Sequence, residues 1–418
     1  MTYDELLAQL LPARRFGVVL GLERMRAILD RLGAPDRRLG AIVHVGGTNG
    51  KGSTVAMIAA LAAAAGQRVA SYTSPHLSSL RERIVIDGAM ISEPAIVAAA
   101  ERVRDAGGDA LTFFEQLTAI AIVAIADAEV DVAVLEVGLG GRLDATNVVD
   151  PAVAVVTGVA LDHEAILGSS LAAIAGEKAG IWKPGRPAIV GASGQAEAVP
   201  VLIEAARAVG APVTVIDDAA VAAVPPVGLP GAHQRRNAAA AIAAVRALGL
   251  PIVAAALATV HHAGRFEVIT PALPGVSHVI LDGAHNPHGA AALAEALRAR
   301  GERPVLIISV SADKDVAAIA AALAPVVLAV VATRYQQDRA LEPAALAASF
   351  AAALAALPRA TPAPVVEAAP ELSAALARAA RHGAPIVIAG SLFLVGEART
   401  LLLDAPTDAL RLSDPPAR

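Results

Sequence analysis

The sequence of 418 residues contains no cysteine. This absence excludes disulfide bonds, thiolate metal ligands and a cysteine nucleophile. Aromatic residues make up only 2% of the chain, so few rings are available to stack on a planar ligand. The net charge of −5 is spread without long basic runs, unlike the surface of a protein that binds nucleic acid or an anionic membrane. Binding to a charged polymer is therefore disfavoured.

The sequence also lacks an uninterrupted apolar run of membrane-spanning length. Its longest uncharged apolar run, residues 316–332, is interrupted by Pro325 and predicts a helix followed by a buried strand. The first residues, MTYDELLAQLLPARR, place acids before the first basic residue and contain no apolar core of the signal-peptide type. We therefore expect a cytoplasmic protein without a membrane partner.

Lysine is scarce, because nearly all cationic side chains are arginine. Its only positions are Lys51, Lys178, Lys183 and Lys314. On a solvated surface arginine readily replaces lysine, so a retained lysine indicates a need for a compact charge or a titratable amine. Lys51 and Lys178 are the candidates for such a function, whereas Lys183 and Lys314 are consistent with ordinary surface residues.

Lys51 lies in the stretch VHVGGTNGKGST, residues 43–54, which departs from the Walker phosphate-binding pattern at two positions. Val45 stands where the pattern needs glycine, and Gly52 stands where it needs a hydroxyl. The physical requirements of a phosphate site are nevertheless present: an apolar strand over 41–45, a glycine-rich turn, a lysine and an alanine-rich helix over 53–65. The stretch therefore predicts phosphate binding; the alternative is an ordinary strand–helix turn capped by Ser53.

Apolar runs alternate with alanine-rich helical stretches, which predicts an α/β fold with parallel strands. A first series of strands is expected at 68–72, 131–137, 153–157 and 188–190, and a second at 278–284, 304–310, 326–333 and 385–391. The length favours two domains, and TPALPGVS at 270–277 is the best linker candidate because it holds two prolines and a glycine. We predict a first domain over 1–270 and a second over 276–418.

Polar residues follow several of these strands, where parallel α/β sheets bind their ligands. Glu136 closes the apolar run DVAVLEV, and a buried carboxylate there needs a cation or a hydrogen-bond donor. His163, beside Asp162, could share a Mg²⁺ ion with Glu136, although histidine is an unusual magnesium ligand and a capping or core role is the alternative. The glycine-rich run at 138–141 is not followed by a helical pattern, so a dinucleotide site is disfavoured there.

Many short motifs occur in the order found in one enzyme family. They are HVGGTNGKGST, TSPHL with RERI, TFFEQLTA, LEVGLGGRLDATN, LDHEAILG, EKAGI, LPGAHQRRNAAAA, GRFEVI, LDGAHNP, ADKD and GSLFLVGE. On these motifs the sequence resembles the bacterial bifunctional folylpolyglutamate synthases/dihydrofolate synthases of the Mur ligase superfamily. The family's phosphate loop, GTNGKGS, has its own spacing, which accounts for both departures from the Walker pattern. The resemblance implies two Rossmann-like domains: an N-terminal P-loop ATPase domain with a mostly parallel sheet and a smaller C-terminal α/β domain.

The resemblance also implies site residues, each at a matching motif position. Those that would hold the ATP phosphates are Gly50, Lys51, Gly52 and Ser53, and those that would contact the rest of the nucleotide are Asn237, Arg265 and Asp282. The implied Mg²⁺ ligands are Ser74, Glu136 and His163. Because Arg265 and Asp282 fall on either side of the predicted linker, ATP is expected between the two domains.

The same carry-over implies substrate-binding residues. Those for the pterin-bearing substrate are Phe113, Phe114, Glu115, Arg142 and Asp144, and those for the incoming glutamate are His285 and Ser391. Core packing is the alternative for the two phenylalanines. Lys178 stands where the family carries a modified lysine, which predicts carbamylation by carbon dioxide; the alternative is an ordinary lysine paired with Glu177. The loop SSLRERI departs from the family's usual sequence, which leaves substrate preference open.

The resemblance implies an ATP- and Mg²⁺-dependent ligase that adds L-glutamate to dihydropteroate, to the glutamate tail of reduced folates, or to both, through an acyl phosphate. Lys51, Glu136, His163 and Lys178 are its expected catalytic residues. The alternatives are another Mur-type amide ligase, such as one acting on peptidoglycan precursors, a P-loop kinase of small molecules, and a non-catalytic nucleotide-binding module. The motifs TFFEQLTA and GRLDATN favour the folate type. We expect a monomer with small-molecule substrates only.

Overall fold

The computed structural model describes residues 1–17, 19, 21–337, 339–356, 365–410 and 412. The chain forms two compact units. The first consists of residues 1–228, 233–260 and the described residues from Asp408 onward, and the second consists of 229–232 and 261–407. The division between Val260 and His261 falls ahead of the linker predicted at 270–277.

The first unit contains an eight-stranded sheet with the order β4-β3-β2-β5-β1-β6-β7-β8. Its strands are β1 (Ala41–Gly46), β2 (Val69–Tyr72), β3 (Ile84–Ile86), β4 (Ala89–Met90), β5 (Val132–Glu136), β6 (Val153–Val156), β7 (Ala188–Val190) and β8 (Val213–Val215). All neighbours from β2 to β8 pair in parallel, whereas β3 and β4 are antiparallel additions at one edge. The mostly parallel sheet expected for this part of the chain is confirmed.

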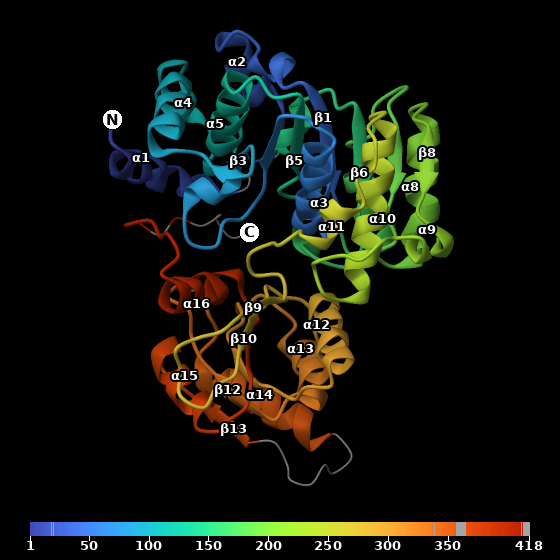
Figure 1. Ribbon diagram of the computed structural model, residues 1–418. Coiled ribbons are helices and arrows are strands. Elements are labelled where there is room, and N and C mark those ends of the chain that lie inside the picture. The colour runs from blue at the N-terminus through green and yellow to red at the C-terminus, as the bar shows by residue number, and fades with distance from the viewer. Residues whose placement is uncertain (18, 20, 338, 357–364, 411, 413–418) are drawn as a thin grey trace. The chain divides into compact units, whose positions relative to one another are not determined.

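Helices connect the strands of this unit (Figure 1). The α-helices are α1 (Tyr3–Leu10), α2 (Glu23–Arg31), α3 (Lys51–Ala64), α4 (Glu93–Asp105), α5 (Phe113–Asp127), α6 (Glu164–Leu167), α7 (Leu171–Ala179), α8 (Val199–Ala208), α9 (Asp218–Ala222), α10 (Ala232–Ala247) and α11 (Ala255–Ala258). Short 3-10 helices are η1 (Leu11–Phe16), η2 (Pro35–Arg38), η3 (Leu80–Arg83), η4 (Gly108–Ala110), η5 (Ala145–Val148) and η6 (Ala196–Ala198).

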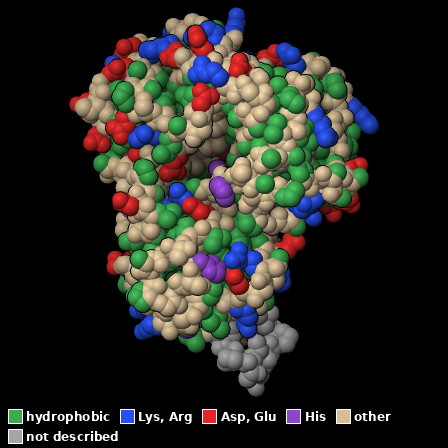
Figure 2. Space-filling model, viewed as in Figure 1, with side chains coloured by type: hydrophobic (Ala, Val, Ile, Leu, Met, Phe, Trp, Pro, Cys, Tyr) green, Lys and Arg blue, Asp and Glu red, His purple; other side chains and the backbone are tan. Residues whose placement is uncertain are grey.

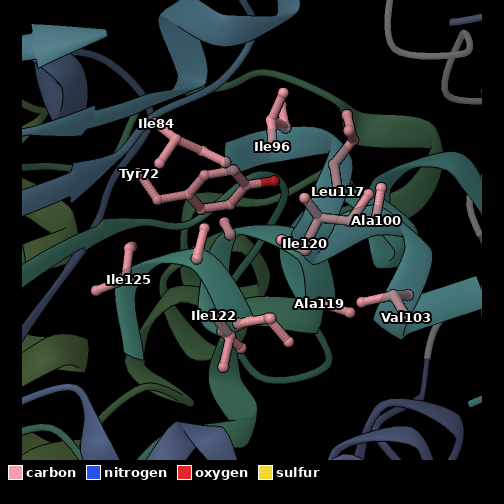
Figure 3. Close-up of a cluster of buried hydrophobic side chains, with 14 of the residues drawn as sticks. Tyr72, Ile84, Ile96, Ala100, Val103, Leu117, Ala119, Ile120, Ile122 and Ile125 are labelled. Carbon is pink, nitrogen blue, oxygen red and sulfur yellow. The ribbon is translucent and has the colours of Figure 1, made fainter. Parts of the chain in front are cut away.

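The largest core cluster of the first unit lies between the sheet and helices α1, α2, α4 and α5. Figure 3 shows Tyr72 of β2 and Ile84 of β3 facing Ile96 of α4 and Leu117 of α5. The Tyr72 hydroxyl remains satisfied inside this apolar cluster because it lies 3.3 Å from the hydroxyl of Thr118. A well-packed core thus supports the strands whose ends carry the candidate site residues.

The second unit contains a six-stranded sheet with the order β13-β12-β11-β14-β10-β9. Its strands are β9 (Glu267–Ile269), β10 (Val279–Leu281), β11 (Val305–Ile308), β12 (Ala329–Ala332), β13 (Val365–Ala368) and β14 (Ile386–Ala389), and its helices are α12 (Pro287–Arg300), α13 (Val316–Leu323), η7 (Ala324–Val326), α14 (Pro343–Ala355), α15 (Leu372–Ala380) and α16 (Leu392–Leu403). Among the described strands of this sheet, only β9 is antiparallel to its neighbour. Because β9 pairs with β10, residues that the sequence assigned to the first domain belong to the second sheet.

Residues 316–332 form helix α13, a short 3-10 helix and the buried strand β12, as the sequence predicted. No helix in the described part of the chain is long and apolar enough to cross a bilayer. Figure 2 shows acidic and basic side chains interspersed on the viewed face, without an extended patch of one sign.

Candidate functional site

The loop between β1 and α3 has a backbone that favours glycine at two positions. Gly47 has φ of 139° and Gly50 has φ of 83°. A Cβ atom on Gly47 would lie 2.0 Å from the hydroxyl of Thr157, and one on Gly50 would lie 2.4 Å from Oδ1 of Asn237. The loop is therefore closely packed against the end of β6 and against α10, which explains why the stretch is rich in glycine.

Helix α3 begins at Lys51, two residues earlier than the sequence predicted. Its N-cap is Gly50, and no side chain caps this end. Ser53 lies inside the helix, so the alternative of a turn capped by Ser53 is wrong. The first N–H groups of an α-helix have no intrahelical acceptor, and the helix dipole favours negative charge beside them. The loop thus offers backbone donors to an anion, in contrast to α4 and α5, whose first turns are capped by Ser92 and Thr112.

Two lysines converge on one carbonyl of this loop. Lys51 Nζ donates to the carbonyl oxygens of Gly47 at 3.2 Å and Thr48 at 3.3 Å. Lys178, in the last turn of α7, donates from Nζ to the same Gly47 oxygen at 3.1 Å. Burial, together with the positive charge of Lys51, lowers the pKa of Lys178 to about 7. The structure thus places a neutralisable amine directly beneath the phosphate loop.

Glu177 does not form the ion pair with Lys178 that the sequence offered as the alternative. Its carboxylate instead accepts from Nη2 of Arg142 at 2.8 Å, on an exposed surface. Lys178 therefore has a carbonyl rather than a carboxylate as its hydrogen-bond partner.

Glu136 is the last residue of β5 and is only 5% exposed. It lies in register with Val45 of β1, which carries the carboxylate to the beginning of the phosphate loop. One carboxylate oxygen accepts the backbone N–H of Ser74 at 3.2 Å, and the other lies 4.0 Å from Nζ of Lys51. The structure therefore brings Lys51, Ser74 and Glu136 together from three separate motifs.

His163 precedes the short helix α6 and has a positive φ of 53°. Its side chain is 39% exposed, and Nε2 lies 4.0 Å from Oδ1 of Asp162. It follows β6, which β1 separates from β5 in the sheet. Across the described ranges, no three or more His, Asp or Glu side chains form a group that could hold a metal ion. A metal shared by Glu136 and His163 therefore stays a prediction.

A buried polar network supports the other side of the phosphate loop. Asn237 of α10 accepts from the Ser193 hydroxyl at 2.7 Å and donates to Oε1 of Gln234 at 3.0 Å. Gln234 donates in turn to the Ser53 hydroxyl at 3.3 Å. Sequence reasoning selected Asn237 and Ser53 but missed Gln234 and Ser193. A glutamine inside an otherwise alanine-rich buried helix was the available signal, because a buried amide needs partners.

The residues Phe113, Phe114 and Glu115 at the start of α5 mainly contact the core and the end of their own helix. Phe113 is 0% exposed within the core cluster, so as placed it offers no surface to a substrate, which agrees with the core alternative. Glu115 accepts the backbone N–H of its N-cap residue, Thr112, at 2.8 Å and a guanidinium N–H of Arg24 at 2.9 Å. The spacing Thr-x-x-Glu is a capping-box signal that was readable in the sequence. Phe114 is half-buried, and a Cβ on Gly138 would touch its ring at 2.4 Å.

Asp144 is buried and organises the loop after β5. Its carboxylate accepts N–H groups of Leu139 at 2.8 Å and Thr146 at 3.0 Å, and it also accepts the Thr146 hydroxyl hydrogen. Nε2 of His44 therefore donates to the same hydroxyl oxygen, at 2.8 Å. Burial raises the pKa of Asp144, while the Thr146 and Leu139 hydrogen bonds oppose that rise. These contacts assign Asp144 to loop architecture.

The remaining candidates, Arg265, Asp282, His285 and Ser391, all lie in the second unit. The expectation that Arg265 and Asp282 belong to different domains is therefore wrong. Asp282 follows β10 and accepts the N–H groups of Phe266 and Ala284, both at 2.9 Å. Its burial raises its pKa, and the Arg265 guanidinium opposes that rise.

The two glutamate candidates are His285, three residues after Asp282, and Ser391, which follows the parallel strand β14. His285 Nδ1 lies 2.7 Å from the Gly283 carbonyl. Ser391 follows β14 and caps α16 by accepting the N–H of Phe393 at 3.2 Å. Both lie where parallel α/β sheets bind ligands.

The two units correspond to two protein-family models. Residues 45–214 match the Mur ligase middle domain, and residues 264–392 match the Mur ligase glutamate ligase domain. Together with the two mostly parallel sheets, these matches define a Mur-type ligase.

The family within this class is shown by curated relatives. The dihydrofolate synthase/folylpolyglutamate synthase of Mycobacterium tuberculosis is 40% identical, over 78% of this chain and 76% of the relative. The protein of the same name from Escherichia coli is 39% identical, over 74% of this chain and 76% of the relative. The chain belongs to the folylpolyglutamate synthase/dihydrofolate synthase family of ATP-dependent amide ligases.

Solved structures agree. The M. tuberculosis folylpolyglutamate synthase complexed with ADP has a TM-score of 0.82 at 36% identity and covers 94% of this chain and 98% of that one. E. coli FolC in complex with DHPP and ADP has a TM-score of 0.84 at 32% identity, with 97% and 98% covered. The chain spans only about half, 50% and 52%, of the bifunctional folylpolyglutamate synthase/dihydropteroate synthases of Haloferax volcanii and Halobacterium salinarum.

Proposed function

We propose that this protein is an ATP-dependent ligase that adds L-glutamate to dihydropteroate, to the glutamate tail of reduced folates, or to both. The observation that carries the proposal is the convergence of Lys51, Glu136 and the Ser74 backbone at the uncapped N-terminus of α3. A relative of 30% identity was solved with Mn, AMPPNP and L-glutamate bound, and E. coli FolC was solved with DHPP and ADP. These ligands match the nucleotide, the amine substrate and the acceptor that the proposed reaction requires.

The residues around the phosphate loop fit a magnesium–nucleotide complex. Gly50, Lys51, Gly52 and Ser53 would hold the ATP phosphates, because the first-turn N–H groups and the lysine present only positive charge there. Ser74, Glu136 and His163 would hold Mg²⁺. This ion commonly takes one or two carboxylates and completes its shell with water and substrate phosphates, so a preformed group of three acids is not required. A bound Mg²⁺ supplies Lewis-acid neutralisation of phosphate oxygens.

The reaction proceeds through two transfers on the substrate. The acceptor carboxylate takes the γ-phosphoryl group of ATP, which releases ADP and forms an acyl phosphate. The amine of glutamate then attacks the carbonyl carbon, phosphate leaves, the amine loses a proton and an amide forms. Lys51 stabilises the transferring phosphoryl oxygens, and Glu136 keeps the Lys51 ammonium within 4.0 Å of its carboxylate. No serine or cysteine nucleophile is needed, which agrees with a chain without cysteine.

We further propose that Arg265 and Asp282 contact the nucleotide, that His285 and Ser391 receive glutamate, and that Phe114 and Arg142 border the pterin-bearing substrate. The family models support a functional division into an ATP-binding part and a glutamate-ligase part, and the sequence predicts 1–270 and 276–418 as their ranges. The unit division at Val260 favours an earlier limit for the first part. A cytoplasmic monomer remains part of the proposal.

One assay separates this proposal from its alternatives. Phosphate release from ATP is measured with dihydropteroate, with a reduced folate monoglutamate, and with a peptidoglycan precursor, each with and without L-glutamate, and products are weighed by mass spectrometry. A product heavier by one glutamyl residue, formed only with glutamate and a folate acceptor, is expected. A phosphorylated product without an amide would indicate a kinase, and no ATP turnover would indicate a binding module. Arg104→Ala, which removes an exposed cation paired with Asp105, is the matched control for Lys51→Ala.

A further inference from the structure

The end of the chain contacts the loop that begins at Ser74. We call residues 408–412, of which all but residue 411 are described, the C-terminal strap. After α16 the chain leaves the second unit, and its described residues from Asp408 onward belong to the first. Figure 1 shows the red end of the described chain below α1. The strap is therefore part of the unit that carries the phosphate loop.

Asp408 makes the first set of strap contacts. Its carboxylate accepts the Leu80 backbone N–H at 2.6 Å and the Tyr3 hydroxyl at 3.0 Å. Its own N–H donates to the Ser78 carbonyl at 3.1 Å. Asp408 is buried, so these hydrogen bonds are shielded from competition by water. A side chain near the end of the chain thus holds the middle of the loop.

Leu412 makes the second set. Its side chain is 3% exposed and belongs to the core cluster that includes Leu80 and Tyr72. Its carbonyl oxygen lies 2.7 Å from Nε2 of His76. The strap is thus anchored both by apolar burial and by a hydrogen bond to the loop.

The protonation state of His76 follows from its partners. Arg83 Nε lies 2.9 Å from Nδ1 of His76, and a guanidinium can only donate. Nδ1 therefore accepts, which places the ring hydrogen on Nε2, where it donates to the Leu412 carbonyl. Burial and the Arg83 charge hold the pKa of His76 well below its usual range, so the ring stays neutral.

Hydrogen bonds join the two ends of the loop, and the carboxylate of Glu82 accepts backbone N–H groups inside it. The Thr73 N–H donates to the Arg83 carbonyl at 2.9 Å. Glu82 accepts N–H groups from Leu77 at 2.7 Å and from Ser78 and Ser79, both at 3.0 Å. Ser74, just inside this closure, donates its N–H to Glu136. Because these hydrogen bonds link the segments of the loop to one another, a change in the shape of the loop is expected to move Ser74.

We propose that the C-terminal strap is a positioning element that holds the loop 74–83 in the shape that presents Ser74 beside Glu136. The proposal rests on the proposed function of Ser74 as a Mg²⁺ ligand. Because the strap follows α16, whose N-cap is Ser391, the chain also links the candidate glutamate residue Ser391 covalently to the strap. Asp408 and Leu412 are its positioning residues, because their contacts are to the loop and to Tyr3.

The test uses point variants of the full chain. Asp408→Ala removes the acceptor of the Leu80 N–H, whereas Asp408→Asn keeps an amide oxygen for Leu80 and offers its NH₂ group to the Tyr3 hydroxyl oxygen. Leu412→Ala removes the buried anchor, and its matched control is Leu410→Ala in the same strap, because Leu410 is 37% exposed. Tyr3→Phe removes only the hydroxyl bond and serves if Asp408→Ala fails to fold.

Two measurements decide the proposal. Hydrogen exchange of amides 77–83 should accelerate in Asp408→Ala and Leu412→Ala, most at Leu80. The Mg²⁺ concentration for half-maximal ligation should rise on the order of tenfold, the factor that corresponds to one lost hydrogen bond to a charged group. Asp408→Asn and Leu410→Ala should resemble the parent in both measurements.

Unchanged exchange in folded Asp408→Ala and Leu412→Ala, or faster exchange with unchanged Mg²⁺ dependence, would overturn the positioning role. A thermal destabilisation alone, shared equally by Leu410→Ala, would also contradict it. If the parent chain shows no glutamate ligation, the proposed function fails, whereas the exchange measurement still tests the contact between strap and loop.

Discussion

At the scale of single residues, the candidate site depends on a few charges held close to one backbone carbonyl. Lys51 and Lys178 both donate to Gly47, and Glu136 lies 4.0 Å from the Lys51 amine. Burial lowers the pKa of Lys178, and the nearby charge of Lys51 acts in the same direction. The two lysines are therefore expected to differ in function.

We expect Lys51→Ala to lower the rate of glutamate ligation by about a hundredfold or more, because the ammonium stabilises charge that develops on the transferring phosphoryl group. Lys51→Arg should also be poor, since the planar guanidinium does not fit a narrow loop as a compact ammonium does. Ligation rates and thermal unfolding are measured together. A rate near that of the parent in folded Lys51→Ala would remove the lysine from the mechanism.

The lowered pKa of Lys178, about 7 against 10.5 in an exposed lysine, makes stability depend on pH. Between these two values the unfolded chain binds a proton that the native amine does not, so the free energy of unfolding should rise from pH 7 toward pH 10. Below pH 7 the native amine is protonated and its burial is least favourable. Lys178→Met should lack this part of the pH dependence. Denaturant titrations at several pH values, without bicarbonate, make the comparison.

The neutral amine is also the nucleophilic form, which attacks carbon dioxide, forms a carbamate and releases a proton. With ¹³C-bicarbonate, the parent should show a carbamate carbon signal by NMR that is absent from Lys178→Arg. Lys178→Ala should be inactive and partly rescued by acetate. Full activity in Lys178→Arg would show that this position supplies positive charge and not a carbamate.

At the scale of elements, the loop between β1 and α3 is shaped by neighbours from far along the chain. Thr157 packs on Gly47, and Asn237 packs on Gly50. The same neighbours hydrogen-bond to the loop region: Thr157 donates to the Asn49 carbonyl at 2.7 Å, and Gln234 joins Asn237 to Ser53. Helix α3 can remain uncapped because these contacts hold its first turn in place.

Gly50→Ala should destabilise the protein more than Gly66→Ala. Both glycines have nearly the same φ, 83° and 85°, so the backbone strain of an added Cβ is matched at roughly 1 kcal/mol. Only Gly50 would bring Cβ against Asn237, whereas nothing lies within 4 Å at Gly66. We expect a difference on the order of 1–3 kcal/mol in the free energy of unfolding, from urea titration. Equal losses would mean that the loop can shift away from Asn237.

At the scale of the whole molecule, the candidate site residues are divided between two units, each built on a mostly parallel sheet. The phosphate loop, Glu136 and Lys178 belong to the first unit, and Asp282, His285 and Ser391 belong to the second. Each set follows parallel strands, where the sheet ends leave backbone and side-chain groups open to ligands.

Arg265→Ala should reduce the thermal stabilisation that AMPPNP and Mg²⁺ give to the parent. A tenfold weaker nucleotide affinity removes about 1.4 kcal/mol of that stabilisation at saturating ligand. The substitution should also raise the pKa of Asp282 further, because it removes the charge that opposes the effect of burial. Arg298→Ala, on the exposed face of α12, is the control. An unchanged ligand-induced shift in Arg265→Ala would assign Arg265 to the structure of the second unit alone.

The sequence by itself determined the buried central strands and the family, and it predicted the phosphate loop. Central parallel strands such as β5 and β12 are buried on both faces, so they appear as continuous apolar runs. The strands that it missed, β4, β8 and β13 among them, are short and partly exposed at sheet edges, where no such run is required. The order of the motifs identified the family, and through it the nucleotide as ligand. Such motifs are readable in a sequence because site residues lie at fixed spacings from the ends of strands.

Only the tertiary structure decided which candidates meet. Lys178 reaches Gly47 across 131 positions, and Asp408 reaches Leu80 across 328. It also decided that Phe113 fills the core, that Glu115 caps its own helix, and that Asp144 holds a loop. Spacing along a chain encodes local geometry, whereas burial and pairing depend on contacts between distant segments. Those contacts set the charge of Lys178 and the environment of each polar group.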